Sequence, residues 1–178
     1  MKLKGSKTEK NLEAAFAGES RAHARYSFYA DEARKEGLGP IAAIFQEAAE
    51  NEKEHARMEL EFLEAIGNTQ ANLEAAATGE HAEWARMYPE FEQAARQEGF
   101  AEIADFFKEV TKIEEEHEKR YRALMENVKA GKVFKRDKVV RWKCPNCGWF
   151  HEGVDAPEEC PTCKLPRSGF EAGPPIVY

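Results

Sequence analysis

The sequence lacks the features of several common protein classes. Its longest run without a charged residue is 37–46, far short of the roughly 18 apolar residues that a membrane-spanning helix needs. The basic start is followed by no apolar segment of the kind found in secretory signal peptides. The 26 Lys and Arg residues are outnumbered by 33 Asp and Glu residues, a net charge of −7, which argues against general nucleic-acid binding. We therefore expect a cytoplasmic protein that binds neither nucleic acid nor membrane.

Cysteine is scarce and confined to one short stretch. The four cysteines form two Cys-x-x-Cys pairs, Cys144 with Cys147 and Cys160 with Cys163. A secreted protein would spread disulfide cysteines over its fold, whereas a reducing cytosol favours thiolate–metal chemistry. The pairs therefore predict one tetrahedral tetrathiolate site, which takes zinc or a single iron. The spacing does not choose between these metals.

Proline is also unevenly distributed, and its distribution divides the chain. Six of the 8 prolines follow Cys144, whereas residues 6–130 contain two. That first region is dominated by Ala, Glu, Arg and Lys, which favour helices. A basic segment with a glycine helix stop joins the two compositions. We predict a helical domain, a linker and a loop-rich metal module, over residues 1–131, 132–138 and 139–178.

The first domain has the pattern of a helical bundle. Apolar residues recur at spacings of three and four, as on one face of an amphipathic helix. Three breaks that contain glycine interrupt this pattern. The pattern therefore predicts a four-helix bundle, with apolar positions spanning 12–30, 41–66, 73–91 and 103–128.

The second half of this domain repeats the first. A shift of 62 positions gives nine identities among the twenty positions 36–55, without a gap. The shift relates two Glu-x-x-His motifs to each other, Glu52 with His55 and Glu114 with His117. The same shift relates two tyrosines, Tyr26 and Tyr88. We therefore predict two related helical hairpins that face each other across a pseudo-two-fold axis.

Charged residues occupy helix positions that should face the core. Residues at i and i+3 share a helix face, and extending each apolar stripe places seven such residues inward, at similar levels along the bundle: Glu19, Glu52, His55, Glu80, Glu83, Glu114 and His117. Burying unpaired carboxylates costs several kcal/mol each. Carboxylates with one imidazole per metal suit iron or manganese, so the pattern predicts a di-metal site. The other histidines, His23, His81 and His151, are expected at the surface or beside the site.

Together these motifs resemble the rubrerythrin family. The resemblance covers nearly the whole chain and rests on residues 18–26, 52–55, 79–83, 87–90 and 114–117 and on the terminal Cys-Pro-x-Cys pairs. It implies a ferritin-like di-iron bundle followed by a rubredoxin-like module with one iron in a tetrathiolate site. It also implies a peroxidase that reduces hydrogen peroxide to water, with electrons relayed through that iron.

The resemblance also assigns roles to individual residues. The persistent carboxylate ligands would be Glu19, Glu52, Glu80 and Glu114, of which Glu52 and Glu114 bridge the irons. The nitrogen ligands would be His55 and His117. Glu83 resembles the extra carboxylate that replaces His55 on one iron when the site is oxidised. Tyr26 and Tyr88 fall on the family's tyrosines beside the site. Their relation by the repeat and their position about two turns from a ligand make them candidate hydrogen-bond or proton donors, although they could also be core aromatic residues.

Two other functions are consistent with the residues. A ferroxidase or iron-handling protein of the ferritin-like class would have the same bundle, but iron storage gives no reason for an attached one-electron carrier. A protein with zinc in the thiolate site would be a non-catalytic interaction protein. Iron in that site makes the protein red, whereas zinc leaves it colourless. For a peroxidase, the electron donor would be an external rubredoxin or an NAD(P)H-dependent reductase.

The connection between the second and third helices predicts a dimer. In a ferritin-like bundle these helices run parallel, so the chain must return roughly 35 Å along the bundle. The break near residues 67–69 spans only roughly 10–20 Å when extended. We therefore predict a homodimer in which two protomers exchange hairpins. A monomeric up-down-up-down bundle would also place the predicted ligands at similar levels.

Overall fold

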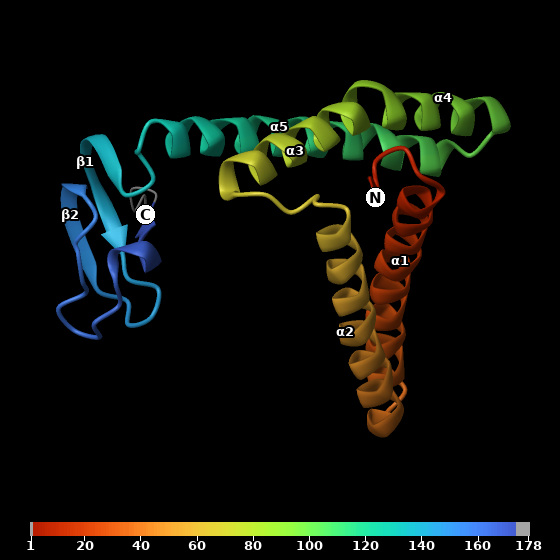
Figure 1. The fold of residues 1–178 in the computed structure, drawn as a ribbon, viewed down its shortest axis with the longest axis horizontal. Helices are drawn as coiled ribbons and strands as arrows, with labels where there is room; N and C mark the ends of the chain where they lie inside the picture. The colour runs from red at the N-terminus through yellow and green to blue at the C-terminus, as the bar shows by residue number, and fades with distance from the viewer. Residues whose placement is uncertain (1, 174–178) are drawn as a thin grey trace. The chain divides into compact units, whose positions relative to one another are not determined.

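The computed structural model describes residues 2–173, which are mainly helical with a small C-terminal sheet (Figure 1). The chain divides into two compact units, Met1–Gly67 and Asn68–Tyr178. The helical architecture and the four-cysteine module expected from the sequence are confirmed. No helix within residues 2–173 is both long and apolar enough to cross a membrane.

The first unit is a hairpin of two long helices, α1 (Lys7–Lys35) and α2 (Gly39–Phe62), which lie side by side (Figure 1). The Ser6 hydroxyl caps α1 by accepting a hydrogen bond from the Glu9 backbone N–H at 3.1 Å. The buried residues of both helices are alanines: Ala30, Ala33, Ala42, Ala49 and Ala56. Small side chains let the two helices approach closely and leave the larger apolar residues outside this seam.

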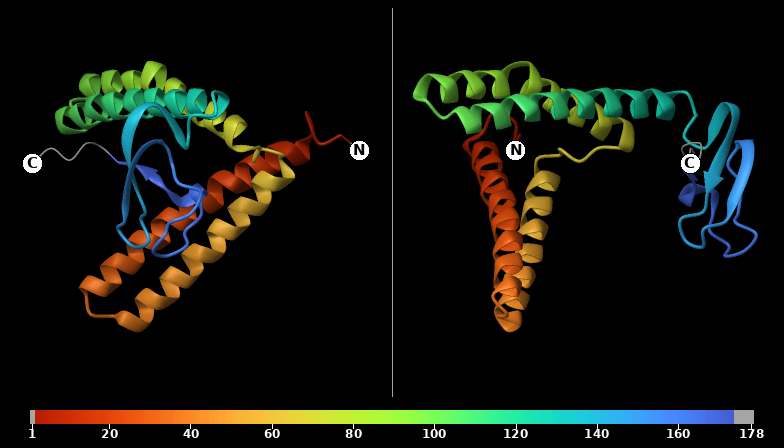
Figure 2. Two further views of the ribbon diagram at one scale, coloured as in Figure 1. Left: turned by 90° about the vertical axis from the view of Figure 1, so that its left-hand side faces the viewer. Right: turned by 180° about the vertical axis from the view of Figure 1, so that it is seen from behind.

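The second unit begins with another hairpin, which has one more irregular arm. Helix α3 (Thr69–Ala82) continues through a π-helical turn, η1 (Glu83–Met87), into α4 (Tyr88–Glu98). All three pack along α5 (Ala101–Lys129), as both views of Figure 2 show. The helix expected over 73–91 is therefore α-helical at both ends and π-helical between.

The sequence repeat explains where this π turn lies. Glu80 follows Glu19 by 61 positions, whereas Tyr88 follows Tyr26 by 62, so the second hairpin gains one residue between them. The Tyr88 backbone N–H donates to the Glu83 carbonyl, five residues earlier, as a π turn requires. Pro89 has no backbone N–H and disfavours the regular α-helical pattern at this point. The inserted residue is therefore absorbed within η1.

The two hairpins end their first arms in the same way. Gly37 and Gly99 are related by the repeat, and their φ angles are 77° and 88°. This left-handed region favours glycine. The residue after each glycine donates its backbone N–H to a carbonyl five residues back, Leu38 to Ala33 and Phe100 to Ala95, both at 2.8 Å. Equivalent turns therefore reverse the chain in both hairpins.

Both hairpins also leave equivalent apolar residues exposed. The related pairs are Tyr29/Phe91, Leu38/Phe100, Ile41/Ile103, Ile44/Phe106 and Phe62/Leu124. Single exposed apolar residues are normal on soluble proteins, but contiguous groups mark contact surfaces. Each hairpin therefore has apolar surface that its own helix–helix seam does not bury.

The C-terminal module is a three-stranded antiparallel sheet of order β2-β1-β3. Its strands are β1 (Lys135–Lys143), β2 (Phe150–Asp155) and β3 (Glu171–Ala172), with a 3-10 turn at Arg167–Gly169. The buried core consists of Trp142, Cys144, Ala156, Cys160 and Phe170. Two of its five members are cysteines, so the core and the thiolate site are built from the same residues.

Candidate metal centres

The first hairpin brings together Glu19 from α1 and Glu52 and His55 from α2. Their candidate ligand atoms all lie within 4.8 Å of one another. Glu52 and His55 share a helix face because three positions separate them, and His55 Nδ1 lies 2.8 Å from Glu52 Oε2. The side chain of Glu52 is 21% exposed and that of His55 is 58% exposed. The carboxylates are therefore more enclosed than the imidazole.

The second hairpin forms a matching group from Glu80 on α3 and Glu114 and His117 on α5. His117 Nδ1 lies 2.6 Å from Glu114 Oε2 and 3.7 Å from Glu80 Oε1. All three side chains are partly buried. We call these two groups the Glu19 triad and the Glu80 triad. Each offers two carboxylates and one imidazole, a ligand set that suits iron or manganese.

Crowding of negative charge is evident in both triads. Burial raises the pKa of Glu19, and a hydrogen bond and repulsion from Glu52 raise it further. Burial likewise raises the pKa of Glu80, as does the negative charge of Glu114. Two neighbouring carboxyl groups hold a proton between them when no other cation is present. A metal ion would take the place of that proton, so the donor sets and their electrostatics both fit metal binding.

Glu83 lies at the first position of η1, outside the Glu80 triad. Its negative charge nevertheless acts on both Glu80 and Tyr88. Burial raises the pKa of Tyr88, and the negative charges of Glu83 and Glu114 raise it further. The Tyr88 hydroxyl therefore stays protonated beside these carboxylates. The metal-binding role of Glu83 and the donor role of Tyr88 stay predictions.

Tyr26 and Tyr88 occupy equivalent aromatic clusters. The Tyr26 ring lies 6.4 Å from that of Phe45, and the Tyr88 ring lies 6.0 Å from that of Phe107, between ring centres. Phe45 and Phe107 are themselves related by the repeat. Both tyrosines are therefore held by neighbouring aromatic rings. The role of Tyr26 as a donor to the site also stays a prediction.

Sequence reasoning missed a buried carboxylate next to the Glu80 triad. Glu118 is 8% exposed, the only buried charged residue in the described part of the chain. Its Oε2 accepts hydrogen bonds from Trp84 Nε1 at 2.5 Å and His81 Nδ1 at 3.0 Å, and its Oε1 accepts from Arg122 Nε at 2.6 Å. Burial alone would raise the pKa of Glu118, but these three donors outweigh burial and lower it to about 2.

The remaining histidines belong to neither triad. His23 Nδ1 lies 2.8 Å from the Ala49 carbonyl oxygen, which ties α1 to α2. His81 contacts Glu118, and His151 stacks on Trp149. His23 and His81 thus have structural hydrogen-bond partners.

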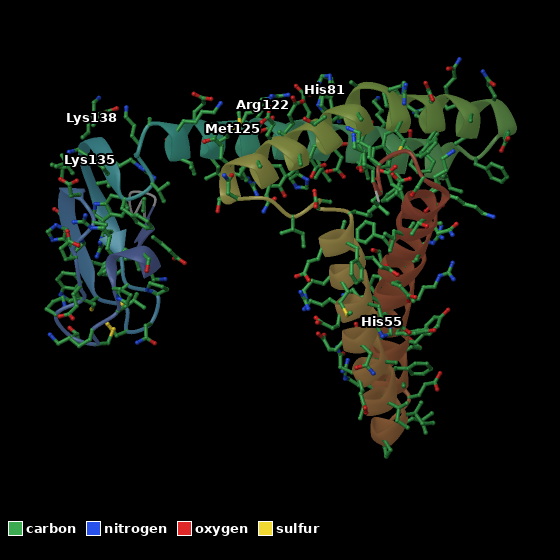
Figure 3. The ribbon with its side chains drawn as sticks, viewed as in Figure 1. His55, His81, Arg122, Met125, Lys135 and Lys138 are labelled. Carbon is green, nitrogen blue, oxygen red and sulfur yellow. The ribbon has the colours of Figure 1, made fainter. Side chains whose placement is uncertain are left out.

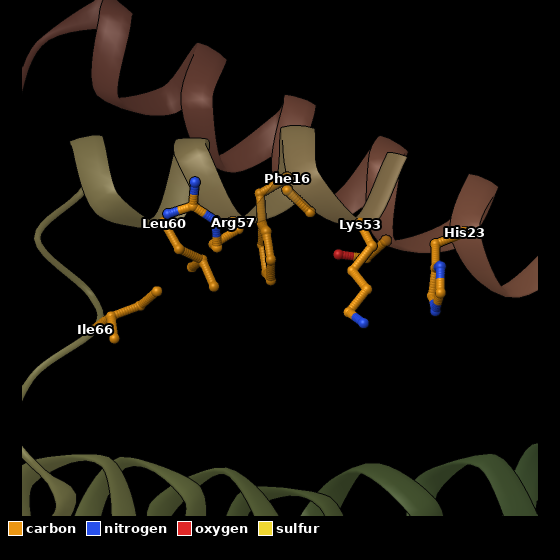
Figure 4. Close-up of a pocket in the computed structure, with 8 residues that line it drawn as sticks. Phe16, His23, Lys53, Arg57, Leu60 and Ile66 are labelled. Atoms are coloured by element: carbon orange, nitrogen blue, oxygen red, sulfur yellow. The ribbon is translucent and has the colours of Figure 1, made fainter. Parts of the chain in front are cut away.

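The α1–α2 hairpin also has a pocket, lined by residues of both helices and by Ile66 (Figure 4). It has a volume of about 280 Å³, and its walls combine apolar side chains with three nitrogen-bearing ones, His23, Lys53 and Arg57. None of the three triad ligands lines it. The pocket is therefore separate from the candidate metal ligands.

The four cysteines converge as the sequence predicts. Their Sγ atoms are separated by 3.5 Å between Cys144 and Cys163, and by 3.6 Å between Cys147 and each of Cys144 and Cys160. A tetrahedral site with metal–sulfur distances of about 2.3 Å requires sulfurs about 3.8 Å apart. Cys144 and Cys160 are buried, whereas Cys147 is exposed. The site is therefore open to the surface on one side.

Two matching turns shape this thiolate site. The backbone N–H of Cys144 donates to the Trp149 carbonyl, and that of Cys160 donates to the Leu165 carbonyl, both at 2.8 Å. Hydrogen bonds from the Asn146 side chain and from the Leu165 backbone N–H lower the pKa of Cys163 to about 6. A thiolate is the form that binds metal. The turns therefore favour the ionised, metal-binding form of this cysteine.

The thiolate module should unfold without its metal. Cys160→Ser removes a buried ligand, and the remaining core is too small to hold the sheet. We therefore expect this variant to expose Trp142, whose indole N–H donates to the Gly153 carbonyl at 3.1 Å. Hydrogen exchange of that N–H, followed by NMR, should accelerate at least about 10-fold, while far-UV circular dichroism keeps its helical signal. Zinc-loaded wild-type chain is the control and should retain protection. Continued protection in the metal-free variant would contradict this prediction.

The free energy of unfolding of the metal-free chain should fall as the pH rises above 4.5, the ordinary pKa of a Glu side chain. Raised pKa values mean that the folded state binds protons more tightly than the unfolded state, so this stabilisation is lost as pH rises through the folded-state values. Glu80→Gln should flatten the decline in melting temperature measured between about pH 5 and 7.

Glu116→Gln is the control for this measurement, because Lys119 lowers the pKa of that exposed carboxylate. It should leave the decline unchanged. Metal-loaded chain should show the opposite slope, since metal binding displaces protons. Equal slopes for wild type and Glu80→Gln would show that carboxylate crowding does not govern the pH dependence.

Both the helical part and the C-terminal part of the chain match known family models. The family model for rubrerythrin matches residues 10–125, and that for the rubrerythrin rubredoxin-like domain matches residues 142–171. Rubrerythrin of Porphyromonas gingivalis is 48% identical, covering 95% of this chain and 91% of that protein. Rubrerythrin of Nitratidesulfovibrio vulgaris is 46% identical, covering 95% of each. A structure of fully reduced, all-ferrous nigerythrin is 32% identical, covering 96% of this chain and 91% of that one, with a TM-score of 0.36. The chain belongs to the rubrerythrin family.

Proposed function

We propose that the chain is a cytoplasmic peroxidase that reduces hydrogen peroxide to water, with electrons relayed through the tetrathiolate centre. The observation that carries this proposal is the presence of two repeat-related carboxylate–histidine triads and four convergent thiolates in one chain. Family membership points to an oxidoreductase. The triads fit a di-iron site, and the thiolates fit a rubredoxin-like iron site.

The bound metals would supply the electrons and the Lewis acidity, two electrons from the iron pair and one at a time from the thiolate-bound iron. The overall reaction consumes one peroxide, two electrons and two protons and forms two water molecules. An external rubredoxin or an NAD(P)H-dependent reductase would supply the electrons. The protein residues must therefore hold the metals, deliver protons and admit peroxide.

The carboxylates set the charge of the site. Glu19, Glu52, Glu80 and Glu114 carry four negative charges, which balance two ferrous ions. Two ferric ions carry two further positive charges and favour an additional anionic ligand. We propose that Glu83, whose negative charge acts on Glu80, supplies this ligand. If Glu83 replaced the neutral His55 on oxidation, its negative charge would stabilise the oxidised state and thereby favour electron release.

Tyr88 is the proposed proton donor. The raised pKa of Tyr88 keeps its hydroxyl protonated next to Glu83 and Glu114, so the hydroxyl can donate a hydrogen bond or a proton where peroxide oxygen is released as water. Tyr26 occupies the related position in the first hairpin. We assign the same role to both tyrosines, one in each hairpin.

We also propose that two protomers exchange hairpins to build each bundle. In a ferritin-like bundle, Glu52 and Glu80 must lie at the same level along the bundle axis. The helix from Glu52 to Phe62 and the helix from Thr69 to Glu80 together measure about 30 Å, so the connection between them would have to run back over that distance. Residues 63–68 reach at most about 25 Å when extended. They are partly coiled, since the Ala65 backbone N–H donates to the Leu60 carbonyl. The equivalent apolar faces of the two hairpins supply the surface that such a bundle would bury.

Reduced, iron-loaded chain should be oxidised faster by micromolar hydrogen peroxide than by dissolved oxygen, as followed by stopped-flow absorption. Glu83→Gln should slow the peroxide reaction by about 10–100-fold, because the added charge on oxidation is lost. Glu90→Gln, an exposed acid on α4, is the matched control and should react as wild type does. Oxidation by oxygen as fast as by peroxide, with accumulation of iron, would instead identify a ferroxidase.

Hairpin exchange predicts that two inactive variants restore each other. Glu52→Gln removes a metal ligand from the first hairpin, and Glu114→Gln removes one from the second. In an exchanged dimer that contains one chain of each variant, one of the two bundles combines two intact hairpins. Refolding the two together should restore about a quarter of the bundle metal sites, as measured by iron analysis. Each variant refolded alone is the control. A mass equal to one 20.2 kDa chain with both metal centres loaded, or no restoration on mixing, would rule out exchange.

A further inference from the structure

We infer that Glu118 is a positioning residue that fixes the Glu80 triad and Glu83 in register across the second hairpin. This inference rests on the proposed function only in taking Glu80, Glu83, Glu114 and His117 as metal ligands. Glu118 joins α5 to both α3 and η1 through its hydrogen bonds to His81 and Trp84.

The residues of this cluster alternate with the candidate ligands along the chain. His81 follows Glu80, and Trp84 follows Glu83, so the two hydrogen-bond donors are each one position beyond a carboxylate. Glu118 in turn follows His117. A shift of α3 and η1 along α5 would break both hydrogen bonds to Glu118. The hydrogen bonds of Glu118 therefore fix the position of the candidate ligands on α3 and η1 relative to those on α5.

Glu118 is itself unsuited to be a metal ligand. Both of its carboxylate oxygens already accept hydrogen bonds, Oε1 from Arg122 and Oε2 from His81 and Trp84. Figure 3 shows His81 and Arg122 on the same side of the α3–α5 hairpin, although they come from different helices. Arg122 balances the charge of Glu118, and the buried carboxylate is satisfied without a metal ion. Its hydrogen bonds thus serve to hold the two arms together.

Comparison with the first hairpin shows why the hydrogen bonds of Glu118 occur only in the second hairpin. At the position of Glu118 the repeat has Ala56, which is buried in the α1–α2 seam. The first hairpin also lacks the inserted residue, and α1 is α-helical throughout. An inserted residue rotates the following part of a helix by about 100°, since an α-helix has 3.6 residues per turn. The arm that carries the π turn is therefore the arm that needs an additional constraint on its register.

The test is metal binding by the full chain with zinc in its thiolate site, titrated with Co²⁺ and followed by visible absorption and calorimetry. Glu118→Gln leaves a side chain of the same shape that lacks the charge and can accept through only one oxygen. We expect one of the two bundle Co²⁺ sites to bind about 10–100-fold more weakly, and the other to bind within a few-fold of wild type. The site with Glu19 and His55 as its own ligands should persist, because His55 rather than Glu83 would bind a divalent ion there.

Glu116→Gln is the matched control, because Glu116 flanks His117 on its other side and pairs with Lys119 in solvent. Both Co²⁺ sites should bind as in wild type. Trp84→Phe keeps the charge of Glu118 and removes one hydrogen bond, so it should weaken the same Co²⁺ site several-fold even if Glu118→Gln fails to fold. Combining the two changes should add little to the effect of Glu118→Gln alone.

Unchanged Co²⁺ binding in a folded Glu118→Gln variant with a lowered melting temperature would overturn the inference, since it would show a purely stabilising role. Equal weakening of both bundle sites would also overturn it. These outcomes are independent of the proposed reaction. A chain that fails to react with peroxide but shows selective Co²⁺ weakening would contradict the peroxidase proposal alone.

Discussion

Repulsion between carboxylates within each helical hairpin is the constraint on which the bundle depends. The hairpins themselves are held by buried side chains, most of them alanines, and require no metal. Into this scaffold the sequence places pairs of glutamates whose burial raises the pKa values of Glu19 and Glu80. Such groups are costly unless a proton or a metal ion compensates them. The metal is thus the natural partner of a structure that is already formed.

The same constraint explains why a symmetric repeat carries an asymmetric site. Both hairpins supply a triad, a tyrosine and an aromatic cluster at related positions. Only the second has the inserted residue, and Glu83 has no acidic counterpart at either repeat shift, where Arg21 and Ala22 stand. Glu83 therefore adds negative charge next to the Glu80 triad that no equivalent residue adds next to the Glu19 triad. The inserted residue and the acidic side chain at position 83 therefore together distinguish two otherwise related groups of residues.

Much of this arrangement could be predicted from the sequence because it depends on local periodicity. Helical spacing located the hairpins, the repeated Glu-x-x-His motif gave both triads, and cysteine spacing gave the thiolate site. The π turn was missed because apolar spacings of three and four fit a helix with or without one inserted residue. The insertion is nevertheless visible in the repeat, since Glu19 and Glu80 are 61 positions apart whereas Tyr26 and Tyr88 are 62 apart. Glu118 was missed because it lies within an acidic stretch, and its burial depends on His81 and Trp84 from another segment.

The two kinds of centre use metal in opposite ways. In the hairpins the candidate ligands lie on helices whose buried contacts do not include those ligands. Ligand exchange or oxidation can therefore occur while the helices stay packed. In the thiolate module Cys144 and Cys160 are themselves core residues, packed with Trp142 and Phe170, so the metal and the fold are inseparable. A rigid thiolate cage changes little in geometry between redox states, which suits a one-electron carrier. A carboxylate site on stable helices can instead rearrange its ligands, which suits a centre that must bind and release a substrate.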